Sequence, residues 1–372
     1  MLSIVNYTDT RDFARLGDAW HSLMAADTGA GLCNSFAWTE NWLHHFWLPH
    51  YALSLTLVMD GDEPVALLPL YHDRREGRVR FLGSGEPEHC EVASEYLDFL
   101  VDPAYQDQQA LYATMAGFLE TGLDAPVEMV NCLENSHARQ VCRRCRYHLE
   151  MPVGRRFRLD LARSFEELCR DFSRNQRRKS RELLNRFDRQ DSLHFKRLPD
   201  RDYAVNWQTL KRLHTRAWNE RGETGAFVDE KFNRFHHRLH REQPQLEQRF
   251  YCLLEGDEPV AINHYYEFHN TLHFYTSGAD RHAATHSPGT LLHLLCLRAL
   301  SGNPGFYDLM KGSLEGSYKN RFCESDATLF DLVVFPRKLG GRSRHAAARM
   351  RRLASRIKRD WLARRQSREN TG

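Results

Sequence analysis

A six-residue segment occurs twice in this chain of 372 residues. Gly-Asp-Glu-Pro-Val-Ala stands at residues 61–66 and again at residues 256–261, a separation of 195 residues. In both places it separates two runs rich in β-branched and aromatic residues, which is the pattern of a β-hairpin. At the same separation Phe-Leu-Gly at residues 81–83 corresponds to Thr-Ser-Gly at residues 276–278, where a third strand is expected to end. Two features in one register indicate a duplicated domain.

The second copy has the clearer pattern for a ligand site. Residues 246–254, 259–268 and 271–277 are predicted strands, and an apolar helix and the strand at residues 306–310 follow. Ser followed by Pro is typical of a helix start, whose free N–H groups and positive dipole end suit a pyrophosphate. The predicted contacts lie at the end of the third strand and at the helix start: Ser277, Gly278, Ser287, Gly289 and Thr290.

This order of elements resembles the core of the GNAT acyltransferases, which bind acyl-coenzyme A at the turn into such a helix. SPGTLLHLLCLRAL, FYDLMKG and SYKNRF, which begin at Ser287, Phe306 and Ser317, more narrowly resemble the CelD-like family, relatives of the FemAB aminoacyl transferases. The resemblance covers residues 155–335 best. It implies an α/β (α+β) fold of two tandem GNAT-like domains with mixed sheets. The chain departs from the usual GNAT pyrophosphate loop, because residues 280–290 contain only one glycine.

The resemblance also implies catalytic residues. Asp308, in the fifth strand, is the expected base or acceptor-orienting carboxylate, and the alternative is a structural pairing with Lys311 or Lys319. Tyr318 is expected to protonate the departing thiolate, and Lys319 to hold a carboxylate or a phosphate.

Residues 162–192 connect the two copies and are predicted to form one long basic helix. The resemblance places Asn175 and Arg178 of this helix beside the active domain, although basic helices are often simply solvated. In the following helix His214 and Trp218 are four residues apart and therefore share a face. They are expected near the acceptor, or else form a packed pair in the core.

The chain is accordingly divided into a degenerate domain at residues 1–161, the connecting helix, an active domain at residues 193–335 and a tail at residues 336–372. In the first domain, Glu86, Glu88 and Glu91 and a strand at residues 96–101 stand where the second has its helix start. Phosphate would meet carboxylates there. The first domain is therefore expected to lack the cofactor and to shape the acceptor cleft.

The tail carries a net charge of +11, whereas the whole chain carries only +3. Its apolar residues recur at spacings of three and four, which predicts a basic amphipathic helix. Such a helix can lie on an anionic membrane, contact RNA or pack on the protein itself. The residues of the apolar stripe are Ala346, Met350, Leu353, Ile357 and Trp361.

Nothing in the sequence suggests export or a membrane span. No run approaches the roughly 20 apolar residues that a membrane helix needs, and the N-terminus lacks the pattern of a signal peptide. The nine cysteines are therefore expected to be reduced thiols in the cytoplasm. Cys142 and Cys145 with His148 lack a second pair at matching spacing, so no metal is expected.

The sequence thus predicts a cytoplasmic acyltransferase that uses acyl-coenzyme A and an amine or hydroxyl acceptor. The CelD-like resemblance implies an acceptor among glycan or lipid precursors at the cell surface, with peripheral contact at the inner membrane face through the tail. Two alternatives stay open. One is a FemAB-like aminoacyl transferase that uses charged tRNA, although a nucleic-acid partner is less favoured. The other is a non-catalytic scaffold with this fold.

Overall fold

The computed structural model describes residues 1–27, 29–243, 246–337, 343–344 and 347–348. We call residues 1–161 the first copy and residues 193–335 the second copy. The first copy contains β1 (Leu2–Tyr7), α1 (Gly17–Ala26), α2 (Phe36–Phe46), β2 (Tyr51–Asp60), β3 (Glu63–Asp73), β4 (Arg78–Phe81), β5 (Leu100–Val101), α3 (Gln108–Thr121), β6 (Val127–Leu133), α4 (His137–Arg144) and β7 (His148–Asp160).

The rest of the chain repeats most of this order. The connection holds α5 (Phe165–Asp171) and α6 (Arg174–Phe187). The second copy contains β8 (Leu193–Leu198), α7 (Tyr203–Asn219), α8 (Glu230–Glu242), β9 (Glu247–Glu255), β10 (Glu258–Phe268), β11 (Thr271–Ala279), α9 (Pro288–Leu300), β12 (Phe306–Gly312) and β13 (Ala327–Val334). The repeated hexapeptide forms the turns β2–β3 and β9–β10, in which Gly61 and Gly256 have φ of 61° and 62°.

All strands of the described residues join one 13-stranded mixed sheet in the order β1-β2-β3-β4-β6-β13-β7-β12-β11-β10-β9-β8, with β5 beside β3. The two copies exchange their last strands at its centre. β13, from the end of the second copy, pairs with β6 of the first, and β7, from the end of the first, pairs with β12 of the second. β7 and β13 pair with each other, antiparallel. The exchange makes the sheet continuous across both copies.

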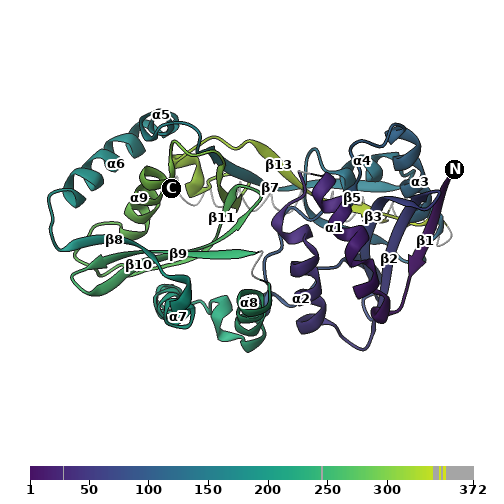
Figure 1. Ribbon diagram of the computed structural model, residues 1–372, viewed down its shortest axis with the longest axis horizontal. Helices are drawn as coiled ribbons and strands as arrows, with labels where there is room; N and C mark the ends of the chain where they lie inside the picture. Colours follow the sequence, from purple (N-terminus) through teal and green to yellow (C-terminus); the bar gives the residue numbers. More distant parts are fainter. Residues whose placement is uncertain (28, 244–245, 338–342, 345–346, 349–372) are drawn as a thin grey trace, which may run out of the picture.

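Helices cover both faces of this sheet (Figure 1). α2 and α8, which occupy equivalent places in the two copies, lie side by side below the centre of the sheet, and the Asn41 side-chain amide donates to the Phe235 carbonyl at 2.8 Å. α5, α6 and α9 lie above the left half. A pseudo-twofold relation between the copies therefore runs through both the α2–α8 contact and the β7–β13 pair.

The connection between the copies differs from the single long helix that the sequence predicts. Phe172 is extended, with φ −64° and ψ 146°, and ends α5, and the Ser173 hydroxyl accepts the Gln176 amide to begin α6. The Phe172 side chain is buried and stacks edge-on against Phe322. Burial of this side chain and the serine cap together favour two helices over one.

Two strand predictions also change. Only Leu100 and Val101 of the expected strand at residues 96–101 pair with β3, because Tyr96 takes a left-handed conformation with φ 62°. For the closing strand of the first copy the sequence predicts residues 157–161, and the structure has the longer strand β7, from His148 to Asp160. Most of the tail, with its predicted amphipathic helix, lies outside the described residues. Within the described part of the chain, none of the helices has the length and apolar character needed to cross a bilayer.

Candidate active site

β11 and β12 separate soon after they begin. They pair in parallel only where Thr271–His273 faces Phe306–Asp308. Beyond this point β11 continues along β10 and β12 continues along β7. The facing edges of the two strands therefore offer backbone groups that the sheet does not use, which a ligand between them can bind.

A bulge in β12 marks the point of separation. The pairing of β12 with β7 shifts register between Asp308 and Lys311, and Met310 between them has φ 63°. The Asp308 carboxylate accepts the Met310 amide at 2.6 Å and so holds the bulge. A left-handed conformation at a non-glycine residue costs on the order of 1–2 kcal/mol, and such strain clusters at functional sites.

The carboxyl group of Asp308 is buried among polar neighbours. The Tyr96 hydroxyl donates to it at 3.3 Å, and Nδ1 of His273 lies 3.8 Å from its second oxygen. Burial raises the pKa of Asp308 to about 6, although the Met310 amide and Arg156 oppose the shift. Burial also lowers the pKa of His273 to about 3, so this histidine is neutral near pH 7 and does not form an ion pair with Asp308.

A segment of the first copy completes this site. Residues 86–96, which we call the strap, cross to the separated strands of the second copy. The Tyr275 hydroxyl donates to the Val92 carbonyl at 2.7 Å, and the Lys311 amide donates to the Glu95 carboxylate at 2.6 Å. With the Tyr96 hydroxyl on Asp308, the strap thus contacts both β11 and β12.

Glu95 is a second carboxyl group at the separation of the strands. Burial raises its pKa to about 7, and the nearby Asp308 adds to the shift while Lys319 opposes it. Burial lowers the pKa of Lys319, whose ammonium donates to the Lys311 carbonyl at 2.5 Å. Glu95 and Tyr96 are not among the site residues predicted from the sequence. No local pattern marks them, because their role depends on the position of the strap in the fold.

A cavity of about 460 Å³ lies between the two copies and reaches Asp308 and His273. Segments of the first copy that precede β7 contribute one wall, and β7 of the first copy together with β11 and β12 of the second contributes the other. Its polar lining residues include Asp27, Asp98, His137, Arg156 and Arg158. The cavity therefore meets the separated strands at Asp308.

The residues predicted for the pyrophosphate fall into two groups. Ser287, Gly289 and Thr290 lie together at the start of α9, where first-turn amides have no partner inside the helix. Ser287 is left-handed, with φ 54°, and a Cβ added at Gly289 would meet only the Ala279 Cβ, at 3.5 Å, among the described residues. This helix start is therefore open to a ligand.

Ser277 and Gly278 instead face α7. The Ser277 carbonyl is 2.8 Å from Nδ1 of His214, which fits a donated hydrogen bond. A Cβ at Gly278 would lie 2.6 Å from the His214 backbone nitrogen, so the close approach of α7 explains the glycine. His214 stacks on Trp218 with ring centroids 5.5 Å apart, and burial lowers its pKa. The pair lies under the end of β11 and does not line the cavity at Asp308.

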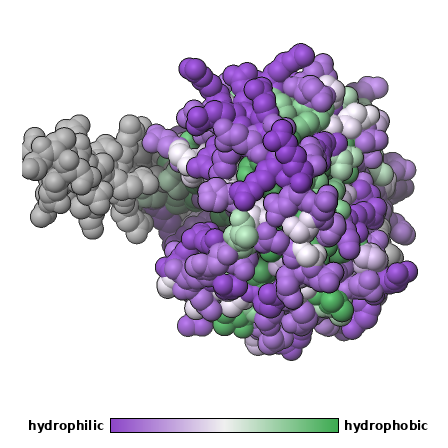
Figure 2. Space-filling view, turned by 90° about the vertical axis from the view of Figure 1, so that its left-hand side faces the viewer, coloured by the Kyte–Doolittle hydropathy of each residue, from purple (hydrophilic) through white to green (hydrophobic). Residues whose placement is uncertain are grey.

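Asn175 and Arg178 are exposed near the start of α6. α6 packs against α9. Arg298, near the end of α9, donates to Asp188, just after the end of α6, at 3.0 Å, and Phe322 contacts both Phe172, just before α6, and His293, in the second turn of α9. The starts of both helices therefore lie toward the same side, where the Ser173 amide also donates to the Arg321 carbonyl. The side of the molecule that lies at the left in Figure 1 is predominantly hydrophilic (Figure 2). The exposed cations of α6 include Arg174, Arg177, Arg178 and Arg181.

Tyr318 begins the 3-10 turn η7 (Tyr318–Arg321) that precedes Phe322. Its side chain is 46% exposed, and partial burial raises its pKa to about 12, so the hydroxyl stays protonated near pH 7. Lys319, the next residue, is buried against β12. Asp308 thus lies in β12, and Tyr318 and Lys319 lie in the turn η7 that follows this strand.

The first copy has no carboxylate at the position that corresponds to Asp308. β6 and β12 have seven residues each and begin 179 residues apart, so Met129 corresponds to Asp308. Glu86 does not point into a phosphate site but accepts the Trp42 indole N–H at 2.9 Å and the Val92 amide at 3.0 Å. The strap occupies the position at which the second copy starts α9.

One comparison with known proteins matches α6 and most of the second copy. Residues 174–320 match the family model described as an acetyltransferase (GNAT) domain. Comparison with curated proteins gives no match. The mixed α/β fold is confirmed, and residues 174–320 are similar to an acetyltransferase (GNAT) domain.

Solved structures extend the likeness over both copies. FemX aligns with a TM-score of 0.53 at 10% identity, over 88% of this chain and 96% of FemX. The C-terminal domain of a putative lysylphosphatidylglycerol synthetase from Agrobacterium fabrum aligns with a TM-score of 0.50 at 11% identity, over 90% of this chain and 95% of that domain. A tandem GNAT protein from the clavulanic acid biosynthesis pathway is also similar, with a TM-score of 0.47 at 16% identity, over 89% and 98% of the two chains.

Proposed function

We propose that this chain transfers an acyl group from acyl-coenzyme A to an amine or hydroxyl acceptor held between the two copies. One observation carries the proposal. Asp308 lies where the separation of β11 and β12 meets the 460 Å³ cavity, so a donor between the strands and an acceptor in the cavity would approach the same carboxylate.

The second copy offers groups that suit acyl-coenzyme A. The first-turn amides of α9 and the positive end of its dipole favour a pyrophosphate, and Gly289 leaves room for it. Arg178 and its exposed neighbours at the start of α6 add positive charge on the same side. The edge of β11 beyond His273 suits the amides of the pantetheine arm, whereas on β12 the Lys311 amide and carbonyl already bond Glu95 and Lys319. Acyl-coenzyme A would supply the activated thioester.

The reaction needs a base, a stabilised carbonyl oxygen and a proton for the thiolate. Asp308 takes a proton from the acceptor as its nitrogen or oxygen bonds to the acyl carbon. Tyr318 donates a proton to the sulfur as the carbon–sulfur bond breaks. Glu95 and Lys319, beside Asp308, set the charge of the site.

The cavity favours a small polar acceptor. Asp98 is already bonded to the His137 and Ala138 amides, and Arg156 and Arg158 both pair with Asp326. Charges of both signs line the space and are mutually compensated, which suits a sugar or a polar head group better than an apolar chain. Glycan or lipid precursors of the cell surface, the class implied by the CelD-like resemblance, have such groups.

Native mass spectrometry of the full chain with a mixture of acyl-coenzyme A species tests this function. We expect one equivalent to be retained, with a preference for one acyl group. Retention of none contradicts the proposal and favours a scaffold.

Aminoacyl transfer is the second candidate. FemX and the lysylphosphatidylglycerol synthetase domain share this fold by TM-score, and the exposed arginines of α6 could contact the phosphates of a charged tRNA. Filter binding of aminoacyl-tRNA at increasing salt distinguishes the two. Salt-sensitive tRNA binding without retention of acyl-coenzyme A favours this candidate.

A further inference from the structure

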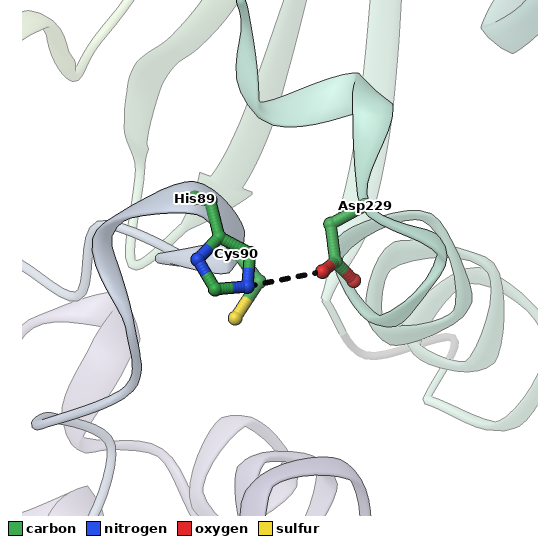
Figure 3. A group of neighbouring side chains, drawn as sticks. All are labelled: His89, Cys90 and Asp229. Atoms are coloured by element: carbon green, nitrogen blue, oxygen red, sulfur yellow. Dashed lines mark ion pairs between the residues drawn. The ribbon is translucent and has the colours of Figure 1, made fainter.

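Three side chains with metal-binding atoms converge outside the proposed site. His89 and Cys90 belong to the 3-10 turn η4 (Glu88–Cys90) of the strap, and Asp229 precedes α8 of the second copy. Their ligand atoms all lie within 4.8 Å of one another. His89 and Asp229 reach toward each other, and the Cys90 sulfur lies beside the imidazole (Figure 3). The cluster thus joins the first copy to the second.

The ligand atoms of the three side chains make only long contacts, at 3.4 Å or more. One oxygen of Asp229 accepts the Lys231 amide at 2.6 Å as the cap of α8, and the other lies 3.5 Å from Nε2 of His89. The His89 side chain is 71% exposed, so its ring can rotate. The Cys90 thiol makes only a weak contact, with the Pro87 carbonyl at 3.4 Å. Small side-chain rotations would therefore bring three donors onto one ion.

The charge around Cys90 favours a cation. Asp229 supplies one negative charge, and Cys90 supplies a second when a divalent ion displaces its thiol proton on binding.

We propose that His89, Cys90 and Asp229 bind a divalent transition-metal ion of the Zn²⁺ class that fastens the strap to α8. A thiolate, an imidazole and a carboxylate are ligands that Zn²⁺ accepts in tetrahedral geometry, with water as the fourth. Zinc–ligand bonds of about 2.0–2.3 Å put neighbouring ligand atoms roughly 3.3–3.8 Å apart. The observed separations exceed this range by about one ångström at most.

The site is distinct from the one that the sequence suggested and rejected. Nδ1 of His148 contacts the Cys145 carbonyl at 2.8 Å, and within the described part of the chain no group of three ligand atoms forms around Cys142 and Cys145. Among the described residues, His89, Cys90 and Asp229 form the single group of this kind. Cys90 stands two residues before Val92, which contacts β11, so the ion would hold the strap close to the point where it meets the proposed active site.

Titration of the metal-free full chain with Co²⁺ tests the proposal by absorption. We expect one equivalent to produce the thiolate-to-cobalt charge-transfer band and the intense visible bands of a tetrahedral site. Cys90→Ser should abolish the charge-transfer band. Cys169→Ser is the matched control, because Cys169 is the one cysteine that is not fully buried and would carry an adventitious signal. No band, or a band lost only in Cys169→Ser, overturns the proposal.

Two further variants keep the test independent of folding. His89→Ala removes an exposed side chain, and Asp229→Asn keeps an oxygen that can cap α8. Each should lower Zn²⁺ affinity at least tenfold and reduce the rise in Tm that Zn²⁺ produces in the wild type. Unchanged affinity in both variants refutes the site. None of these readouts depends on acyl transfer.

Discussion

Asn131 and Met310 occupy the same place in two strands that begin 179 residues apart, and both are left-handed, with φ of 54° and 63°. The two bulges also touch. Lys311, next to Met310, donates from its ammonium to the Asn131 side-chain oxygen at 2.6 Å. The strained strand geometry is therefore present in both copies, and the copies meet at it.

What holds each bulge differs between the copies. Asp308 holds the Met310 amide from its own strand, whereas the Asn131 amide donates to Asp331 of the exchanged strand β13 at 3.0 Å. The first copy therefore keeps the backbone shape without a carboxylate at the position of Asp308. This difference supports a single reactive site in the second copy.

The carboxyl groups at this site predict a pH dependence. Burial raises the pKa of Asp308 to about 6, and only the carboxylate can accept a proton, so kcat/KM should rise with pH and level off above this value. Asp308→Asn should lower turnover about 100-fold or more, leave coenzyme A binding unchanged and remove the acidic limb. Calorimetry and pH–rate profiles check both effects.

The Glu95→Gln variant tests whether Glu95, rather than Asp308, is the base. The pKa of Glu95 is raised to about 7. If Glu95 were the base, the acidic limb of the kcat/KM profile would lie near pH 7, and Glu95→Gln would remove that limb. An unchanged profile in Asp308→Asn would show that Asp308 holds the bulge without acting as a base.

Gly289→Asp should abolish coenzyme A binding, because a carboxylate would stand at the start of α9 where the phosphates are expected. Gly289→Ala is its control. The nearest described atom would lie 3.5 Å from the added Cβ, so this variant should fold and bind. Calorimetry should find one site in the wild type and none in the aspartate variant. Two equal sites, or full binding by Gly289→Asp, would contradict the assignment.

Gly278→Ala should destabilise the fold by about 1–3 kcal/mol, because its Cβ would lie 2.6 Å from the His214 backbone nitrogen and displace α7. Gly117→Ala in α3 is the matched control. A Cβ there meets no described atom within 4 Å, and alanine favours a helix, so stability should rise by about 0.5–1 kcal/mol. Urea unfolding measures both. Equal effects of the two substitutions would refute the packing explanation for Gly278.

Glu86 should make stability fall as pH rises. Burial raises its folded pKa from 4.5 to about 7, so its contribution is fully present below the unfolded pKa and is lost as pH rises through about 7. Between pH 5 and pH 8 the wild type should lose about 2 kcal/mol relative to Glu86→Gln. Parallel urea denaturation of the two chains at both pH values checks this. A constant difference between them would mean that Glu86 is ionised throughout.

Local patterns in the chain were enough to predict much of the second copy. The alternation of apolar residues, the repeated turn and the Ser287-Pro288 helix start depend on neighbours within a few residues. The strand FYDLMKG also follows from its local pattern, whereas Asp308 within it was selected through the family resemblance. These features follow from backbone propensity and side-chain spacing, which the order of residues states directly.

The features that local patterns did not predict depend on long-range packing. The exchange of β7 and β13, the arrival of Glu95 and Tyr96 at β12, and the meeting of Cys90 with Asp229 each join residues more than 100 positions apart. Phe172 ends a helix because its side chain is buried against Phe322, a contact that local spacing does not contain. Such contacts depend on which surfaces the folded chain buries together, and the free energy of that burial outweighs the weaker local preferences.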